Sequence, residues 1–148
     1  MIETDEKKCV GSKEHISFPK LNRQNVVARI DTGAKTSSIH CDKLWVERIN
    51  NKEVLCANLL RKTTNVTKFS KFKLKKVKSS NGHVQMRYTV KLMVHFSGDE
   101  FETEFTLSNR DTMNHAVLLG RKFLKNRYLV DVSRMFMHTL KKRQKTTE

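Results

Sequence analysis

Residues 26–40, VVARIDTGAKTSSIH, place an Asp-Thr-Gly triplet directly after a short apolar run. The run has the pattern of a β-strand, so the triplet falls where that strand ends. A glycine at this point permits backbone angles or close approaches that a Cβ would block. The sequence therefore predicts that the Asp31 carboxylate is held at a defined point on a tight turn, which Thr32 and Gly33 shape.

Short apolar runs like this one recur along the chain, ending with MFMHTL at 135–140, whereas helical periodicity is nearly absent. Such runs, separated by polar segments, are typical of an all-β barrel or sandwich. Hairpin turns are predicted at 49–53 (INNKE), 79–83 (SSNGH) and 97–100 (SGDE), where turn residues separate two runs. One short helix is expected, at 120–127 (GRKFLKNR).

At 148 residues the chain fits one domain of ordinary size. We place this domain at 10–140, with flexible basic or polar ends at 1–9 and 141–148. The N-terminus lacks the apolar region of a signal peptide, and no stretch reaches the roughly 20 apolar residues that a membrane span needs. The three cysteines are odd in number and lack CxxC spacing, so we expect free thiols. The expectation is a cytoplasmic protein without a membrane partner.

The formal net charge of +15 is concentrated in the middle of the chain. From Val54 to Gly98 there is no Asp or Glu, so a β structure here would carry a strongly positive face. Such a face favours contact with nucleic acid, ribosomes or acidic peptides, and the alternative is an ordinary solvated face. The basic residues of the stretch are Arg61, Lys62, Lys68, Lys71, Lys73, Lys75, Lys76, Lys78, Arg87 and Lys91.

A carboxylate at the end of a strand can take part in acid–base catalysis when a second carboxylate lies beside it. Two carboxylates at hydrogen-bonding distance share a proton, because both cannot ionise cheaply. The ionised one can take a proton from water while the neutral one hydrogen-bonds a carbonyl oxygen. Asp-Thr-Gly alone is a weak signal, since surface turns often contain it. Here an apolar strand leading into Gly-Arg, AVLLGRKFL at 116–124, follows much later in the chain.

That pairing of Asp-Thr-Gly-Ala with Leu-Leu-Gly-Arg resembles a protomer of a retropepsin-type aspartic protease. Four ordered blocks, ARIDTGAKTSSIHC, KKVKSSNGHVQMRYTV, EFTLSNRDTMNHAVLLGRKFL and YLVDVS, are similar to the bacterial retropepsin-like aspartic endopeptidases associated with RimK, often labelled ATP-dependent zinc proteases. The resemblance runs from about Val10 to Ser133. It implies an all-β, retropepsin-like closed barrel with one short helix after Leu-Leu-Gly-Arg, and the activity of an aspartic-type peptidase.

The resemblance makes Asp31 the catalytic carboxylate on a turn that Ala34 completes. Gly120 and Arg121 match the Gly-Arg pair that braces this turn from behind. In retroviral members an acid follows the Asp-Thr-Gly-Ala block, whereas Lys35 stands here. Arg121 therefore needs a different partner.

The resemblance also assigns a second group of residues to contact with the substrate. The tip of the 79–83 turn corresponds to a substrate-covering flap, and Gln85 stands where the bacterial family commonly has an acid. Two arginines that match family arginines could grip an acidic peptide or form structural salt bridges. The residues assigned to the flap or to substrate binding are Lys35, Ser79, Ser80, Asn81, Gly82, Arg87 and Arg110.

Only one Asp-Thr-Gly occurs, so a two-aspartate site needs a second chain or another acid in this one. A C2 homodimer would bring two copies of Asp31 together. The in-chain alternatives are Asp111, whose triplet lacks the glycine, and Asp131 in VDVS. The net charge of +15 opposes association unless the basic faces point away from the axis.

No metal or nucleotide cofactor is expected, despite the label of the family. HExxH or a comparable zinc ligand set is absent from the sequence, and so is the phosphate cradle GxxxxGK[ST]. The six histidines are scattered, which leaves a zinc site built with Cys41 or Cys56 as a minor alternative.

The leading hypothesis is an endopeptidase that activates water between paired Asp31 side chains. The resemblance also links it to a ribosomal protein with a glutamate tail and to ribosome association, and a basic groove would suit such a substrate. The rival is a non-catalytic basic β domain that binds RNA or the ribosome through Lys68 to Lys78, with an affinity that falls steeply with salt. A third hypothesis is an adaptor that binds acidic peptide tails without turnover.

Overall fold

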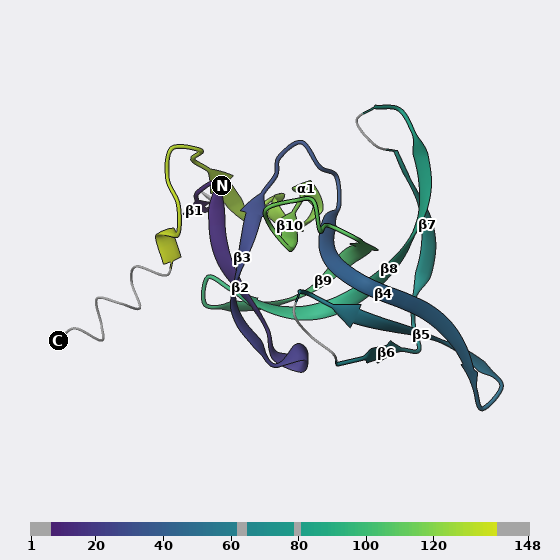
Figure 1. Cartoon of the computed structure of the whole chain (residues 1–148). Coiled ribbons are helices and arrows are strands. Elements are labelled where there is room, and N and C mark those ends of the chain that lie inside the picture. Colours follow the sequence, from purple (N-terminus) through teal and green to yellow (C-terminus); the bar gives the residue numbers. More distant parts are fainter. Residues whose placement is uncertain (1–6, 62–64, 79–80, 139–148) are drawn as a thin grey trace, which may run out of the picture.

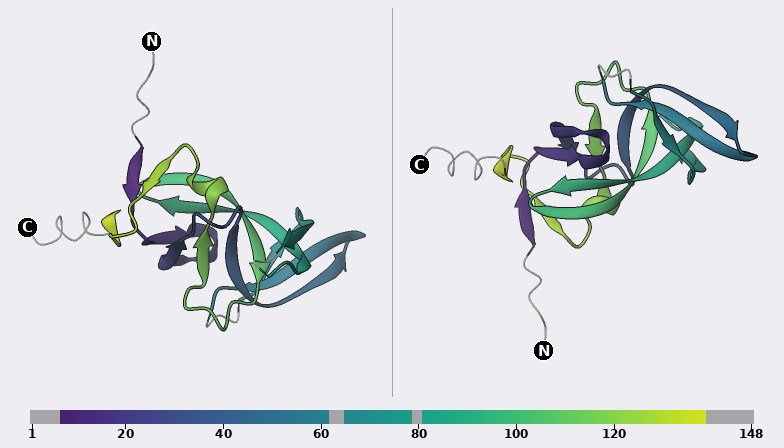
Figure 2. Two further views of the ribbon diagram at one scale, coloured as in Figure 1. Left: turned by 90° about the horizontal axis from the view of Figure 1, so that it is seen from above. Right: turned by 90° about the horizontal axis from the view of Figure 1, so that it is seen from below.

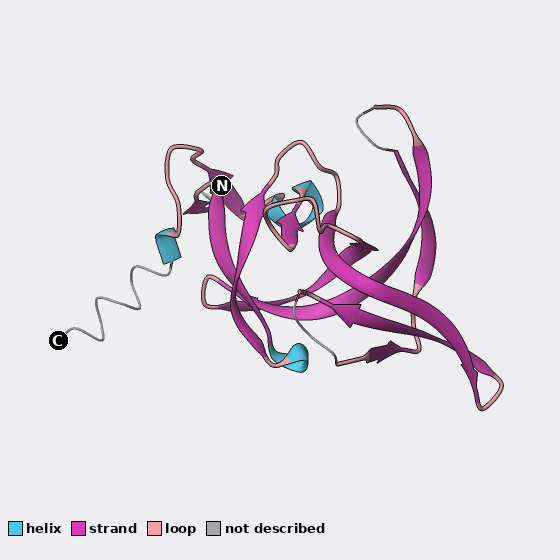
Figure 3. Ribbon diagram, viewed as in Figure 1, coloured by secondary structure: helices cyan, strands magenta, loops and turns pink. Residues whose placement is uncertain are grey.

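The computed structural model describes residues 7–61, 65–78 and 81–138, and it is nearly all-β (Figures 1 and 3). The described helices are short, and none of them is long and apolar enough to cross a membrane. In chain order the elements are β1 (Lys8–Val10), β2 (Lys13–Phe18), η1 (Pro19–Leu21), β3 (Arg23–Ile30), β4 (Ser37–Ile49), β5 (Lys52–Leu59), β6 (Thr67–Phe69), β7 (Lys73–Lys78), β8 (Val84–Phe96), β9 (Asp99–Ser108), β10 (Val117–Leu119), α1 (Arg121–Leu124) and β11 (Tyr128–Val130).

Most of the described strands form one sheet that returns on itself. Along the sheet the order is β10, β3, β2, β8, β9, β4, β5 and β6, with β7 paired to β8. An additional pairing of β10 with β4 joins the path into a ring of six strands, from β10 through β3, β2, β8 and β9 to β4. The expected all-β class is confirmed, in the form of this ring of paired strands.

β10 lies between the two strands that flank the Asp-Thr-Gly turn. It runs parallel to β3, with Leu119 opposite Ile30, and antiparallel to β4, with Val117 opposite Ile39. All four of these side chains are buried, so apolar packing holds the three short segments together. The loop that connects β3 to β4 is thereby fixed at both of its ends.

The helix packs its apolar residues into the core, as GRKFLKNR predicts, but it is shorter than the predicted span. The Phe123 ring meets the buried Phe96 ring edge to face, with centroids 5.2 Å apart. The helix ends at Leu124, because Lys125 leaves helical geometry with a ψ of 132° and Asn126 has a φ of 67°. Four residues therefore suffice to cover this part of the core.

Three hairpin turns occur where they were predicted. Asn50 and Asn51, between β4 and β5, have φ values of 52° and 64°. The turn between β8 and β9 likewise has positive φ, and Gly82 near the tip of the β7–β8 hairpin has a φ of 87°. These are the angles that Asn and Gly adopt most readily. Ser79 and Ser80 lie outside the described residues.

The first described strand begins before the predicted domain boundary. Lys8 and Cys9 belong to β1, which pairs in parallel with β11 in a separate two-stranded sheet. Both views in Figure 2 place this sheet at one end of the molecule and the β4–β5 hairpin at the other. Residues 141–148 lie outside the described part of the chain.

The run MFMHTL is not a strand in its described residues, 135–138, contrary to its apolar pattern. The backbone N–H groups of Met137 and His138 donate to the buried Glu14 carboxylate at 3.1 and 3.4 Å, and Gly11 N–H donates to it at 2.8 Å. Met137 and His138 are helical instead, and the Glu14 carboxylate accepts from N–H groups that the start of a helix leaves unpaired.

Candidate functional site

Asp31 lies directly after β3, on a turn held by backbone hydrogen bonds. Its N–H donates to the Leu119 carbonyl oxygen at 2.9 Å, and the Gly33 N–H donates to Asp31 Oδ1 at 2.9 Å. A Cβ on Gly33 would lie 3.2 Å from Asp31 Oδ1, and the φ of Gly33 is not positive. The glycine is therefore explained by the close approach of this carboxylate rather than by an unusual backbone angle.

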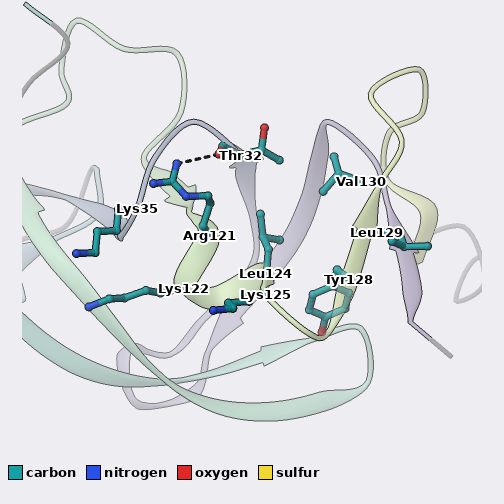
Figure 4. A pocket seen from close by; sticks show the side chains of 9 residues that line it. All are labelled: Thr32, Lys35, Arg121, Lys122, Leu124, Lys125, Tyr128, Leu129 and Val130. Carbon is teal, nitrogen blue, oxygen red and sulfur yellow. Dashed lines mark hydrogen bonds between the residues drawn. The ribbon is translucent and has the colours of Figure 1, made fainter. Parts of the chain in front are cut away.

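The start of α1 holds the turn from the other side. The N–H of Arg121 donates to the Ala34 carbonyl oxygen at 2.8 Å, and that of Lys122 donates to the Lys35 carbonyl oxygen at 3.0 Å. The Arg121 guanidinium donates to the Thr32 carbonyl oxygen at 3.0 Å (Figure 4). A backbone carbonyl is thus the partner that Arg121 has in place of an acid at position 35.

Gly120 is the point of closest approach between this helix start and the turn. A Cβ built on Gly120 would lie 2.7 Å from the Thr36 carbonyl oxygen and 2.8 Å from that of Ala34. Both contacts are with backbone, which a change of rotamer cannot relieve. The Gly120 N–H also donates to Ser37 Oγ at 3.1 Å. Glycine at this position therefore lets α1 lie directly against the turn.

Gly120→Ala should destabilise the fold by about 3 kcal/mol, the upper part of the range for overpacked sites. The added methyl group forces the loop away from α1 and breaks the Arg121–Ala34 bond. Denaturant unfolding measures the loss. The control is Gly98→Ala, where a Cβ meets nothing within 4 Å and only the positive φ of 84° opposes it. This control should cost about 1 kcal/mol, and equal losses in the two variants would contradict the steric argument.

A pocket of about 770 Å³ lies on the α1 side of the turn (Figure 4). Apolar side chains of α1 and β11 share its walls with basic ones, and Asp31 is not part of its lining. Lys35, which the sequence assigns to substrate binding, lines this pocket. Its basic residues are Lys35, Arg121, Lys122 and Lys125.

Arg110 lies in the segment between β9 and β10. Only 8% of its surface is exposed, and its Nε donates to the His115 carbonyl oxygen at 2.9 Å. Burial lowers the pKa of its guanidinium, and the positive charges of Arg61, Arg87 and Arg29 lower this pKa further, whereas Asp31 raises it. The charges of three other arginines and of Asp31 therefore all act on the Arg110 guanidinium.

Neither matched arginine forms a structural salt bridge with a carboxylate of the described residues. Arg87 instead donates from Nε and Nη2 to Gln85 Oε1, at 3.3 and 3.0 Å. Gln85 thus supplies a neutral acceptor, and the positive charge of Arg87 stays uncompensated by a carboxylate of the described residues. This observation favours substrate binding over the salt-bridge alternative.

The β7–β8 hairpin, proposed from the sequence as a flap, forms an arm beside the site. Asn81 and Gly82 lie at its tip, and Arg87 lies lower on β8. In Figure 1 the tip stands away from the 31–36 loop. A role as a flap stays a prediction.

His40, Asp42 and Asp111 form the one group in the described residues that has the spacing of a metal site. The buried His40 Nε2 lies 2.6 Å from Asp42 Oδ1 and 3.4 Å from Asp111 Oδ1. The Arg110 N–H donates to His40 Nδ1 at 2.8 Å, so Nδ1 uses its lone pair there and Nε2 carries the proton. A metal ion bound at Nε2 would need the lone pair of Nε2, where the proton sits. This group therefore fits a structural histidine better than a zinc ligand set.

Cys41, which follows His40 in the chain, is a buried free thiol. Burial, and then the charge of Asp42, raise the pKa of Cys41 to about 11. The group with metal-site spacing in the described residues includes neither Cys41 nor Cys56, so it lends no support to a zinc site built with a cysteine.

Both in-chain candidate acids have partners other than Asp31 in the described residues. The Asp111 carboxylate faces His40 Nε2. The Asp131 carboxylate accepts the Ser133 hydroxyl at 2.6 Å and the Ser133 N–H at 3.0 Å, and these bonds lower its pKa. Both acids are thus engaged elsewhere, and a second carboxylate for Asp31 has no source among the described contacts.

The sequence analysis did not assign Arg29, Arg61 or His40 to the site. Arg29 stands two residues before Asp31, so strand alternation directs both side chains to the same side, and this signal was available. Arg61 donates to the carbonyl oxygens of Arg110 and Met113 and holds that loop. Its role, like that of His40, depends on contacts between distant segments, for which the sequence carries no local signal.

Comparison with known sequences extends over nearly the whole described chain. The family described as "RimB-like: Retropepsin-like aspartic endopeptidase RimB" matches residues 9–141. A protein of Shewanella halifaxensis named "Probable alpha-L-glutamate ligase" is 35% identical over 146 residues, covering 90% of this chain and 30% of that protein. A protein of the same name from Shewanella pealeana matches with the same identity and coverage. The chain therefore spans about a third of the length of these curated relatives.

Among solved structures, the fold is similar to that of a Legionella pneumophila protein of unknown function. The TM-score is 0.72 at 23% sequence identity, and the match covers 90% of this chain and 99% of that one. This likeness concerns the fold alone. Together with the sequence family, it confirms that the ring of strands has the retropepsin-like fold expected from the four sequence blocks.

Proposed function

Because this chain belongs to the RimB-like family of retropepsin-like aspartic endopeptidases, we propose that it hydrolyses peptide bonds with Asp31 as one of two catalytic carboxylates. The observation that carries the proposal is the turn itself. The Gly33 N–H orients the Asp31 carboxylate, while β10 and α1 fix the turn from two sides. A carboxylate held in this way keeps its direction when a substrate binds, which is what acid–base catalysis requires.

In the proposed reaction the ionised carboxylate of the pair takes a proton from a water molecule, whose oxygen attacks the peptide carbonyl carbon. The neutral carboxyl group donates a hydrogen bond to the carbonyl oxygen as negative charge develops there. Collapse of the tetrahedral intermediate breaks the C–N bond, and the amine leaves with a proton from the pair. This chemistry uses no metal ion and no nucleotide.

We place the second carboxylate on another copy of the chain. The two in-chain candidates, Asp111 and Asp131, bind other groups, and a C2 axis beside Asp31 would supply its equivalent from a partner. β1 and β11 pair only with each other among the described strands, so the outer edge of β11 is open to further pairing. Leu129 on β11 is 59% exposed and Val132 is 79% exposed, which offers apolar contacts to a second copy near the turn.

Glutamate-rich peptides are the substrate class that the proposal favours. The relatives named as alpha-L-glutamate ligases contain sequence like this chain within a longer protein. A peptidase joined to an enzyme that adds glutamate would be placed to meet peptides with glutamate tails. The arginines near Asp31 and the acid-free stretch from Val54 to Gly98 suit such an anionic substrate by charge.

The second candidate function is a non-catalytic basic domain. Its support is the hairpin surface, where Lys76 and Lys78 are exposed and Lys75 alone of the β7 lysines is paired, with Glu104 at 2.8 Å. A domain of this kind would bind RNA or acidic tails without changing them, and its affinity would fall steeply with salt.

Incubation with matched peptides ending in tails of glutamate or glutamine tests the proposed function. Mass spectrometry should show two products from internal cleavage of the glutamate peptide. The cleavage rate should be the same with and without EDTA, and cleavage should not require added ATP. A rate abolished by EDTA would contradict the metal-free mechanism. Intact peptides across acidic to neutral pH, together with salt-sensitive binding of RNA, would favour the non-catalytic domain.

A further inference from the structure

Glu14, on β2, is a fully buried carboxylate that the proposed reaction does not use. Its charge has no ion-pair partner among the described residues. Instead the N–H groups of Gly11 and Met137 donate to its Oε2 at 2.8 and 3.1 Å, and the His138 N–H donates to its Oε1 at 3.4 Å. Burying a carboxylate costs free energy unless donors of this kind replace its water. Because the donors come from two distant parts of the chain, Glu14 joins those parts.

The two parts are residues 10–14, around the β1–β2 connection, and residues 131–138, which follow β11 (Figure 1). The Ser12 N–H donates to the Arg134 carbonyl oxygen at 2.8 Å, and a Cβ on Gly11 would clash with that same oxygen. The two backbones are thus in direct contact at this point. Two further backbone bonds join the segments, from the Asp131 N–H to Val10 O at 2.8 Å and from the Phe136 N–H to Lys13 O at 2.9 Å.

Ser12 also contacts the residue that precedes the catalytic carboxylate. The Ile30 N–H donates to the Ser12 carbonyl oxygen at 2.9 Å, and Asp31 is the next residue in the chain. Ser12 therefore binds Arg134 through its N–H and Ile30 through its carbonyl oxygen. β10 and α1 hold the Asp31 turn itself, whereas Ser12 holds the end of the strand that leads into it. A displacement of Ser12 would be passed directly to the backbone that carries Asp31.

We propose that Glu14 is a positioning residue for peptide cleavage, which fastens Gly11 and the 131–138 segment around Ser12 and thereby fixes the direction of Asp31. The inference rests on the proposed function, because it takes Asp31 as the catalytic carboxylate. Glu14 is buried and meets no substrate, so its effect should appear in turnover and not in substrate affinity. Misplacing a catalytic group by about 1 Å can lower a rate by about 100-fold.

Two substitutions of Glu14 should give a graded loss of turnover. In Glu14→Gln one amide oxygen can still accept the Gly11 and Met137 N–H groups that Oε2 accepts, but the amide NH2 then faces the His138 N–H, donor against donor. Glu14→Leu removes every acceptor. With the glutamate-tailed peptide, kcat should fall by about 3- to 10-fold in Glu14→Gln and by about 30- to 100-fold in Glu14→Leu, while KM stays within about twofold of wild type.

Two control variants separate positioning from stability. Val94→Ala opens a cavity at a fully buried position of β8, so it should lower the melting temperature and leave kcat unchanged wherever the protein is folded. Glu104→Gln makes the same chemical change as Glu14→Gln at a carboxylate that pairs with Lys75, and it should also keep kcat. A kcat that falls with melting temperature in all variants alike would overturn the proposal, and so would a change confined to KM.

Amide hydrogen exchange, followed by NMR, observes the same coupling without turnover. Glu14→Gln should speed exchange of the Ile30 amide, which donates to Ser12, by about tenfold. The His40 amide, which donates to the Ala116 carbonyl oxygen at 2.7 Å, should keep its rate. Faster exchange at 137–138 alone would overturn the proposal, because Glu14 would then fasten only the 131–138 segment. Equal acceleration at all amides would indicate a global loss of stability and would overturn it as well.

The outcomes separate this inference from the proposed function. If the wild-type protein cleaves no peptide, the peptidase is contradicted, whereas selective exchange at Ile30 would still support the coupling of Glu14 to the Asp31 turn. Wild-type kcat in folded Glu14→Gln and Glu14→Leu would overturn the positioning role and keep the peptidase. If Glu14→Leu does not fold, the kinetics and exchange of Glu14→Gln decide. A deficit in kcat that disappears at high protein concentration would assign the effect to association of two copies and would overturn positioning of Asp31.

Discussion

Replacing Asp31 with asparagine should lower peptide cleavage by about 1,000-fold or more without destabilising the fold. The asparagine amide oxygen can still accept the Gly33 N–H, which Asp31 Oδ1 accepts at 2.9 Å. The backbone bond of residue 31 to Leu119 is unchanged by the substitution. The variant loses the group that takes a proton from water, and an amide cannot replace it. Cleavage rates of the wild-type and Asp31→Asn proteins test the loss of activity, and their thermal unfolding tests whether stability is kept.

Asp111→Asn and Asp131→Asn are the matched controls, because they make the same chemical change at the two other aspartates that could complete a pair. Each should cleave at close to the wild-type rate, since one carboxylate faces His40 and the other is bonded to Ser133. A loss at either position equal to that of Asp31→Asn would identify a second carboxylate within the chain. Full activity of Asp31→Asn would contradict the proposed chemistry.

Features set by neighbouring residues were predictable from the sequence. The β4–β5 turn follows from Asn50-Asn51, because asparagine tolerates positive φ better than most residues do. The tight Asp31 turn follows from a glycine placed two residues after an acid at the end of a strand. In each case the backbone geometry depends on residues within the turn itself, so a local pattern carries the information.

Features set by pairing between distant segments were not predictable in the same way. The parallel pairing of β10 with β3 joins Leu119 to Ile30, and nothing in either run specifies the other as its partner. For the apolar run MFMHTL the sequence pattern predicts a strand, and in its described residues this prediction is wrong. In the structure a buried carboxylate, Glu14, binds the N–H groups of this segment instead.

Arg110 shows why the site was predicted only in part. It lies in the polar segment SNRDTMNH, which has the composition of a solvated loop, so a sequence pattern gives no reason to bury it. Its burial comes from His40 on β4 and from the loop contacts of Arg61, both far away in the chain. The resemblance to a family identified the residue, but only the structure shows that it lacks a counter-ion.

Mixing wild-type chains with an excess of Asp31→Asn chains should reveal whether the active site is shared between two copies. If each site takes one Asp31 from each chain, a mixed dimer has a single catalytic carboxylate and is inactive. After co-refolding with about nine variant chains for each wild-type chain, only about one wild-type chain in ten has a wild-type partner. Activity per wild-type chain should then fall about tenfold. A site completed within one chain predicts no change, because every wild-type chain keeps both of its carboxylates.

The mixing experiment needs a control for substrate capture, since inactive chains still bind peptide. Saturating peptide removes this effect on the rate, and adding the same excess of Asp31→Asn chains after folding, without time for exchange, should leave activity unchanged. Wild-type protein alone should also lose specific activity on dilution, because the +15 charge of each chain opposes association. Added salt screens this repulsion and should shift the loss to lower protein concentrations. The same salt weakens the attraction of a basic surface for RNA, so opposite salt responses distinguish an obligatory dimer of the peptidase from a polyanion-binding domain.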